Sequence, residues 1–215
     1  MKFLNRLFVV FLLTMPGGIW YRQIGDIGFY FSEGVPDGQL IYVLSKLAGL
    51  YALLFIAMQM IAALPGYSGN PLRRWQGRSH RLTGIVIICL AVAHLMLFFA
   101  AVSIRQDAPA LGMFLPSFED YYHTRLAFGL FALWLLLIVM VAGIMRFRSK
   151  AGLARWVHKL YWVAIVLVYL HALAVGTEAQ TRAGLLFYGL LGLIVAFLFI
   201  ASLLRRPGAR RAYTQ

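Results

Sequence analysis

Six long apolar segments constrain the fold of this chain more than any other feature of its 215 residues. Most of them reach the ~20 residues that an α-helix needs to cross ~30 Å of hydrocarbon. Apolar residues make up 62% of the sequence and charged residues only 13%, against about 45–50% and about 25% in soluble domains. The sequence therefore predicts an all-α membrane protein, a single domain over residues 1–215 built as a six-transmembrane-helix bundle. The predicted spans are 3–20, 39–64, 80–104, 123–145, 156–176 and 183–204.

The first span is the weakest of the six. Its uninterrupted apolar part, Leu7 to Met15, is short and follows Lys2 and Arg6, which is the pattern of a secretory signal peptide. No small-x-small cleavage motif follows this part, and the next residues are Pro16, Gly17, Gly18, Ile19 and Trp20. We therefore predict that the first span is retained.

Charge placement predicts the direction of the spans. With the N-terminus in the cytoplasm, fifteen basic residues fall in inside segments and four fall outside, while Lys46 lies within the second span. All seven acidic residues fall outside. This asymmetry follows the positive-inside rule and predicts that both termini are cytoplasmic. The net charge of +13 is then explained by basic residues that lie beside the anionic lipids of the membrane. A nucleic-acid partner is not needed to explain it.

Four of the five histidines form a repeated pattern. His80 and His94 are fourteen residues apart on the third span, and His158 and His171 are thirteen apart on the fifth. The two spans run in the same direction, and these separations rise ~21 Å and ~19.5 Å along a helix. The histidines therefore form two pairs at matched depths, one pair in each leaflet. This is the arrangement of bis-histidine haem ligation, repeated twice.

Rotation about the helix axes leaves the orientation of these side chains open. At about 100° per residue, fourteen residues bring His94 to within ~40° of the azimuth of His80. Thirteen residues leave His158 and His171 ~140° apart on an ideal helix. Either a local distortion brings them closer, or the two cofactors are approached from different sides.

Other readings of single residues stay open. A histidine near the end of a span can simply be a residue of the membrane interface, without a ligand role. His123 is interpreted as such an interface residue. The alternative is that His123 contacts a haem propionate or an outer substrate. Two ligands at each level are too few for a closed zinc site. Because Cys89 is the single cysteine, an intrachain disulfide is excluded. We interpret Cys89 as a small core residue. Lys46 either reaches a propionate or extends towards water.

Basic residues crowd the cytoplasmic starts of the two histidine-bearing spans. They are Arg78 and Arg81 on the third span and Arg155 and Lys159 on the fifth. Topology and lipid headgroups account for such charges. The same residues are candidates for binding haem propionates, an anionic flavin (FMN or FAD), or a flavoprotein that docks beside the inner haem.

The two histidine-bearing segments resemble the ferric-reductase-like transmembrane family. That family includes ferric reductases, NADPH oxidases and the haem-binding membrane subunit of the bacterial methionine sulfoxide reductase system. The residues that carry the resemblance are His80-Arg81-Leu82-Thr83-Gly84 with Ala93-His94-Leu95, and Trp156-Val157-His158-Lys159-Leu160-Tyr161 with Leu170-His171. Span count and order resemble the family over the whole chain, but only these two segments are specific. The resemblance implies that His80 and His158 bind an inner haem b, and that His94 and His171 bind an outer one.

The sequence also departs from the larger family members. No GxGxxG motif or glycine-rich phosphate loop follows the last span. We therefore expect the compact bacterial branch, located in the inner membrane. Some members of that branch carry arginine at the position of His80, so the histidine here favours two haems.

The expected function is transmembrane electron transfer by a di-haem cytochrome b. The expected donor is a cytoplasmic flavin reductase or flavin, and the expected acceptor is a periplasmic oxidoreductase subunit. A stand-alone ferric-chelate reductase is the first alternative, which would make the chain an oxidoreductase in its own right. The second alternative is a non-haem transporter or assembly protein whose histidines handle protons or metal ions.

Overall fold

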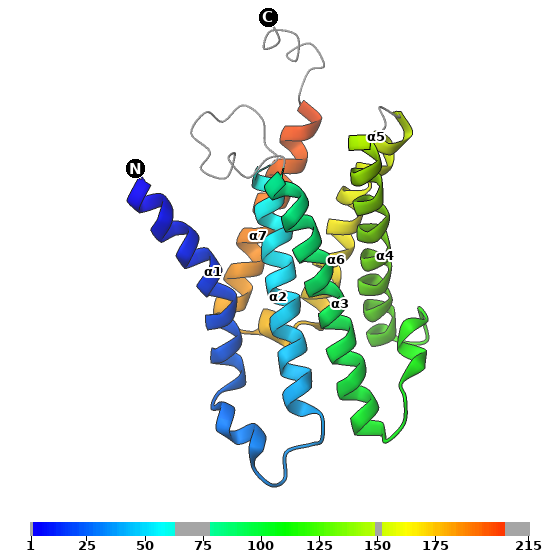
Figure 1. The fold of residues 1–215 in the computed structure, drawn as a ribbon. Coiled ribbons are helices and arrows are strands. Elements are labelled where there is room, and N and C mark those ends of the chain that lie inside the picture. Colours follow the sequence, from blue (N-terminus) through cyan, green and yellow to red (C-terminus); the bar gives the residue numbers. More distant parts are fainter. Residues whose placement is uncertain (1, 63–77, 149–151, 205–215) are drawn as a thin grey trace, which may run out of the picture.

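The computed structural model describes residues 2–62, 78–148 and 152–204, and every regular element in these ranges is a helix (Figure 1). The long helices are α1 (Lys2–Ile24), α2 (Gln39–Ala62), α3 (Arg78–Gln106), α4 (Tyr121–Arg148), α6 (Tyr161–Val175) and α7 (Arg182–Leu204). A short helix, α5 (Gly152–His158), precedes α6. Single 3₁₀ turns occupy the loops: η1 (Ile27–Phe31), η3 (Leu111–Phe114) and η4 (Thr177–Gln180).

Five segments of the described chain are long and apolar enough to cross a membrane. They are Gln39–Ile61, Ser79–Gln106, Tyr121–Met145, Gly152–Val175 and Arg182–Ala201. These segments confirm the all-helical, membrane-spanning prediction for spans two to six. The predicted end of the second span, residues 63 and 64, lies outside the described residues. The first predicted span forms a helix, α1, but α1 is not among the five segments.

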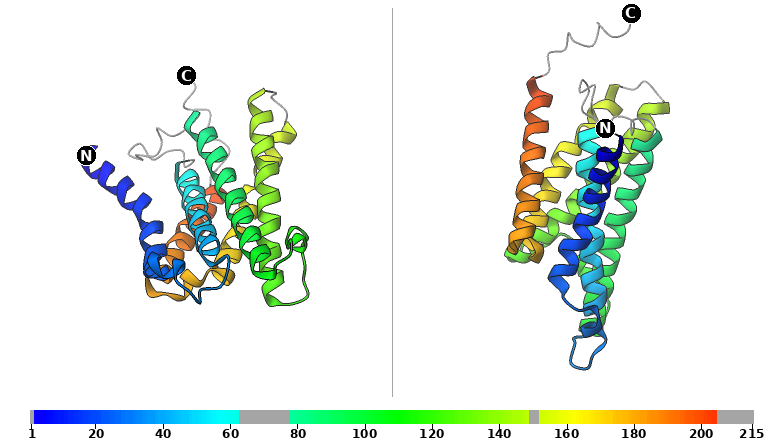
Figure 2. Two further views of the ribbon diagram at one scale, coloured as in Figure 1. Left: turned by 60° about the horizontal axis from the view of Figure 1, so that its bottom comes forward. Right: turned by 90° about the vertical axis from the view of Figure 1, so that its left-hand side faces the viewer.

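The long helices run back and forth between two ends of the bundle (Figure 1). One end holds the start of α1, the start of α3 and the end of α7, while the other end holds η1, η3 and η4 (Figures 1 and 2). The helices α3 and α6 therefore run in the same direction. This arrangement agrees with the parallel orientation predicted for the two histidine-bearing spans.

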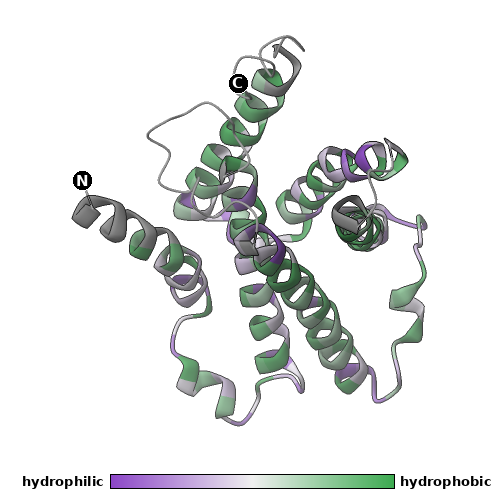
Figure 3. Cartoon of the chain, turned by 45° about the horizontal axis from the view of Figure 1, so that its top comes forward, coloured by the Kyte–Doolittle hydropathy of each residue, from purple (hydrophilic) through white to green (hydrophobic). Residues whose placement is uncertain are grey.

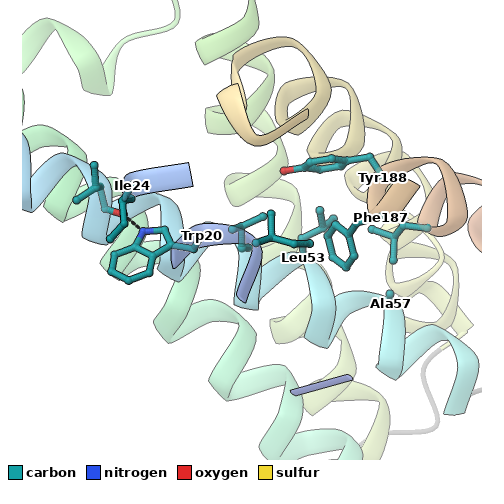
Figure 4. Close-up of a cluster of buried hydrophobic side chains, with 10 residues drawn as sticks. Trp20, Ile24, Leu53, Ala57, Phe187 and Tyr188 are labelled. Carbon is teal, nitrogen blue, oxygen red and sulfur yellow. Dashed lines mark hydrogen bonds between the residues drawn. The ribbon is translucent and has the colours of Figure 1, made fainter. Parts of the chain in front are cut away.

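A tight cluster of side chains joins α1, α2 and α7 on one side of the bundle (Figure 4). Trp20 of α1, Leu53 of α2 and Phe187 of α7 are each less than 10% exposed. The indole Nε1 of Trp20 donates a hydrogen bond of 2.5 Å to the backbone carbonyl of Val43. Buried indole groups require such a partner, so this bond fixes α1 against α2.

The long helices consist mostly of apolar residues (Figure 3), and many of their large apolar side chains are exposed. On α7, the side chains of Leu186, Leu193 and Phe197 are 74%, 71% and 66% exposed. A contiguous apolar surface of this kind is costly in water and is the normal surface of a helix in lipid. Cys89 is also exposed on α3, so the sequence-based interpretation of Cys89 as a core residue is wrong. Small apolar side chains suit a lipid-facing position as well as a core.

Candidate functional site

The outer histidine pair lies inside the bundle. His94 of α3 and His171 of α6 have ring centroids 6.2 Å apart, with the ring planes inclined by 72°. Both side chains line a cavity of about 180 Å³ that α2, α3, α4 and α6 enclose. The lining of this cavity is almost entirely apolar, as is usual for cofactor pockets.

The second pair, His80 and His158, repeats this geometry between the other end of α3 and the short helix α5. His80 lies near the start of α3, and His158 is the last residue of α5. Their ring centroids are 6.3 Å apart, and the ring planes are inclined by 71°. The two pairs predicted from the sequence therefore exist in the structure, one above the other along the bundle axis.

Three of the four histidines are oriented by backbone carbonyl groups of a neighbouring helix. The Nδ1 atom of His94 lies 2.7 Å from the carbonyl oxygen of Ser45 on α2. The Nδ1 atoms of His171 and His158 lie 2.8 Å and 3.0 Å from carbonyl oxygens on α4, those of Arg125 and Val139.

These contacts determine which ring nitrogen carries the proton. A carbonyl oxygen only accepts hydrogen bonds, so each Nδ1 must be the protonated donor. In a neutral imidazole, the Nε2 atom then keeps its lone pair and can bind a metal ion. Backbone partners of this kind are the usual outer-shell support of metal-binding histidines, because they fix both tautomer and ring direction.

A break in the fifth predicted span reduces the angle between the directions of the His158 and His171 side chains. The amides of Lys159 and Leu160 bond to the carbonyls three residues earlier, those of Trp156 and Val157. The amide of Trp162 bonds in the same way to Lys159. Each 3₁₀ step turns the chain by about 20° more than an α-helical step. The break thus accounts for roughly 60° of the ~140° by which an ideal helix would separate the two side chains.

A buried ion pair lies at the outer end of the cavity. Lys46 of α2 lines the cavity, and its Nζ donates a hydrogen bond of 2.5 Å to Thr177 Oγ1. The same ammonium lies 3.6 Å from Glu178 Oε1, and the side chain of Glu178 is only 2% exposed. The structure shows Lys46 paired with Glu178 and only partly exposed, and its predicted contact with a propionate stays a prediction.

The predicted basic residues lie at the end of the bundle that holds the starts of α1 and α3. Arg81 on α3, Arg155 on α5 and Lys159 in the turn after α5 are exposed there, near His80 and His158 in the chain. The ammonium of Lys159 lies 3.9 Å from the ring centroid of Trp156. Arg78 is the first residue of α3, and its side chain lies outside what the structure describes.

His123 stands apart from both pairs. Its backbone amide bonds to Asp120 Oδ1 at 2.7 Å, and its Nδ1 lies 2.8 Å from Asp120 Oδ2. Asp120 thereby caps the start of α4. These hydrogen bonds from His123 lower the pKa of the Asp120 carboxyl. The exposed position of His123 agrees with its interpretation as an interface residue.

Sequence reasoning missed two features of the site. The pairing of Lys46 with Glu178 joins two residues that are 132 positions apart, so no local pattern predicts it. Three glycines, Gly49, Gly129 and Gly143, lie directly against histidine rings. Gly129 and Gly143 are fourteen apart on α4, close to the spacing of the histidines that they contact. That shared spacing is the sequence feature that could have revealed them.

The fold and the site together define an all-helical, multi-pass membrane protein with paired histidines inside the bundle. In the described part of the chain, no group of three or more His, Cys, Asp or Glu side chains is placed to hold a metal ion. The chain matches no family model, no curated protein and no solved structure with which it was compared.

Proposed function

We propose that this chain is a six-span cytochrome b of the ferric-reductase-like type, which carries electrons across a membrane between two haem groups. His94 and His171 would bind the outer haem, and His80 and His158 the inner one. When bound, each haem supplies a one-electron iron couple. The remaining task of the chain is to position, orient and enclose the two groups.

The spacing of the histidine rings carries this proposal. Two imidazoles on opposite sides of one metal ion have ring centres about 6.3 Å apart, because each metal–nitrogen bond is about 2.0–2.1 Å and each ring centre lies roughly 1.1 Å behind its nitrogen. The observed separations are 6.2 Å and 6.3 Å. Two unrelated core histidine pairs have no reason to share this value.

The surroundings of the outer pair fit a haem in three respects. The Nε2 atoms of His94 and His171 keep their lone pairs, because each Nδ1 donates to a carbonyl. The cavity beside the rings is lined mostly by apolar side chains, as is usual for a cofactor pocket. Lys46 is half-buried at the cavity edge, and its ammonium, which pairs with Glu178, could also donate a hydrogen bond to a propionate.

The proposed orientation follows from charge. Basic residues Arg81, Arg155 and Lys159 mark the inner end of the bundle, and the positive-inside rule assigns that end to the cytoplasm. With α1 as a sixth span, both termini are cytoplasmic and the cavity of His94 and His171 lies towards the outer face. A bacterial inner membrane is the proposed location.

The donor and acceptor follow from this orientation. The basic surface at the inner end suits an anionic flavin, either free as FMN or FAD or held by a cytoplasmic reductase. The outer haem would reduce a periplasmic oxidoreductase subunit, with a ferric chelate as the simpler acceptor. Because two histidines would bind each haem iron, we expect the haems to relay electrons and not to bind oxygen.

Electron flow across a sealed bilayer tests the proposal. The purified protein is reconstituted into liposomes that enclose ferricyanide, and dithionite is added outside. We expect the wild-type chain to reduce the enclosed ferricyanide at least tenfold faster than empty liposomes. The variants His94→Leu and His80→Leu should each reduce the rate to that of empty liposomes, because each removes one of the two relay positions.

The control is His123→Leu, which removes a histidine that lies outside both pairs and should leave the rate unchanged. A protein that holds two haems but moves no electrons across the bilayer would contradict the proposed function. Equal rates for wild type and His94→Leu would contradict the role of the outer pair.

A further inference from the structure

Each oriented histidine packs against a glycine of the neighbouring helix, in one repeated arrangement. The ring of His94 lies against Gly49 of α2, and the rings of His171 and His158 lie against Gly129 and Gly143 of α4. In all three cases, the carbonyl that accepts the Nδ1 proton belongs to the residue four positions before the glycine.

Helix geometry explains the offset of four. A helical side chain leans towards the N-terminus and covers the turn that precedes its own Cα. A side chain at the position of the glycine would therefore shield the carbonyl four residues earlier. With glycine there, the second lone pair of that carbonyl stays accessible to a donor from outside the helix.

The space available for an added Cβ atom increases from Gly129 to Gly49 to Gly143. A Cβ atom added at Gly129 would lie 2.8 Å from both Cε1 and Nδ1 of His171, a distance that real contacts do not reach. At Gly49 the nearest ring atom of His94 would be 3.1 Å away, and at Gly143 the ring of His158 would be 3.4 Å away. An added Cβ thus clashes with the ring at Gly129, is tight against it at Gly49 and is in ordinary contact with it at Gly143.

We propose that Gly49, Gly129 and Gly143 are positioning residues that set the direction of the three histidine Nε2 atoms through a glycine-exposed carbonyl. This inference rests on the proposed haem ligation and deepens it. Glycine normally weakens a helix relative to alanine, so its use at all three contacts calls for a reason of this kind. The rings need both the space and the carbonyl.

The test is a graded series of single substitutions, Gly129→Ala, Gly49→Ala and Gly143→Ala. Gly189→Ala on α7 is the matched control, because an added Cβ there meets nothing within 4 Å. Haem per chain is counted by the pyridine haemochrome assay, and the spin state and axial ligand field are recorded by EPR. A purely structural role in helix packing would not change the ligand field.

We expect Gly129→Ala to lose one of two haems or to convert the outer one to high spin, with added imidazole restoring low spin. Gly49→Ala should keep two haems but shift the EPR signal of the outer one. Gly143→Ala should affect only the inner haem, and least. If Gly129→Ala does not fold, Gly49→Ala decides the outcome.

Two different failures can be told apart. Wild-type protein with two low-spin haems, together with glycine variants identical to Gly189→Ala, would overturn this inference and leave the proposed function intact. Wild-type protein that folds in haem-replete cells without binding haem would overturn both.

Discussion

The Nδ1 atom of His171 on α6 lies 2.8 Å from the backbone carbonyl oxygen of Arg125 on α4. This contact links a ring inside the bundle to a helix that carries no histidine of either pair. It holds the protonated nitrogen away from His94 and leaves the other nitrogen directed into the cavity. The helices α2 and α4 thus act as the outer support of the two pairs.

The pairing predicts how haem loss combines in double variants. His94→Leu and His171→Leu should each reduce the haem content from two to one per chain, and combining them should cost no further haem. Combining His94→Leu with His80→Leu should remove both. The pyridine haemochrome assay measures each value. Equal losses for the two double variants would contradict the assignment of pairs.

Removal of one charge from the buried ion pair should destabilise the protein. Lys46→Met leaves the 2% exposed carboxylate of Glu178 without its cation, and Glu178→Gln leaves the ammonium unpaired. Loss of one partner of a buried pair costs about 3–5 kcal/mol. We expect both single variants to unfold at lower temperature, as measured by calorimetry in detergent. The double variant Lys46→Met/Glu178→Gln should recover part of this lost stability. If its melting temperature fell by the sum of the two single drops, the proposed pairing would be contradicted.

The Asp120 cap of α4 predicts that part of the stability of the folded protein depends on pH. Hydrogen bonds from His123 lower the pKa of Asp120 in the folded protein. A lowered folded-state pKa adds stability above the unfolded value of about 3.9, and that stability disappears as the pH falls through the folded pKa. Asp120→Ala should therefore melt slightly below wild type at pH 7 and together with it at strongly acidic pH. Glu119→Gln is the neighbouring control, and a difference that persists at acidic pH would contradict this explanation.

The contact between α1 and α2 predicts that α1 is an integral part of the bundle. Trp20→Phe keeps most of the buried ring but removes the Nε1 donor to the carbonyl of Val43. A hydrogen bond of this kind contributes about 0.5–1.5 kcal/mol. We expect a small drop in melting temperature, and none for Trp134→Phe, whose ring is 47% exposed. Equal melting of both variants would indicate that α1 does not add to the stability of the bundle.

Much of the architecture is predictable from the sequence because long apolar runs have few alternatives. Spans two to six begin within four residues of their predicted starts, since each is bounded by charged or loop-forming residues. The pairing of His80 with His158 and of His94 with His171 follows from spacing and direction. Both quantities are fixed once the spans are known.

The rest depends on contacts between distant segments. No proline or glycine marks the break at Lys159 and Leu160, so the turn that reorients His158 is not visible in the sequence. The neighbours of the histidines, such as Gly129 and the carbonyl of Arg125, depend on how α4 rotates against α6. Glycines in membrane helices usually serve close packing, and only the structure shows which of them face a ring.

The most direct measurement is the visible spectrum of the purified wild-type protein, oxidised and dithionite-reduced, together with haem per chain. We expect two haems b per chain and low-spin spectra in both oxidation states, because two histidines would bind each iron. A folded protein that carries no haem when isolated from haem-replete cells would contradict the central claim.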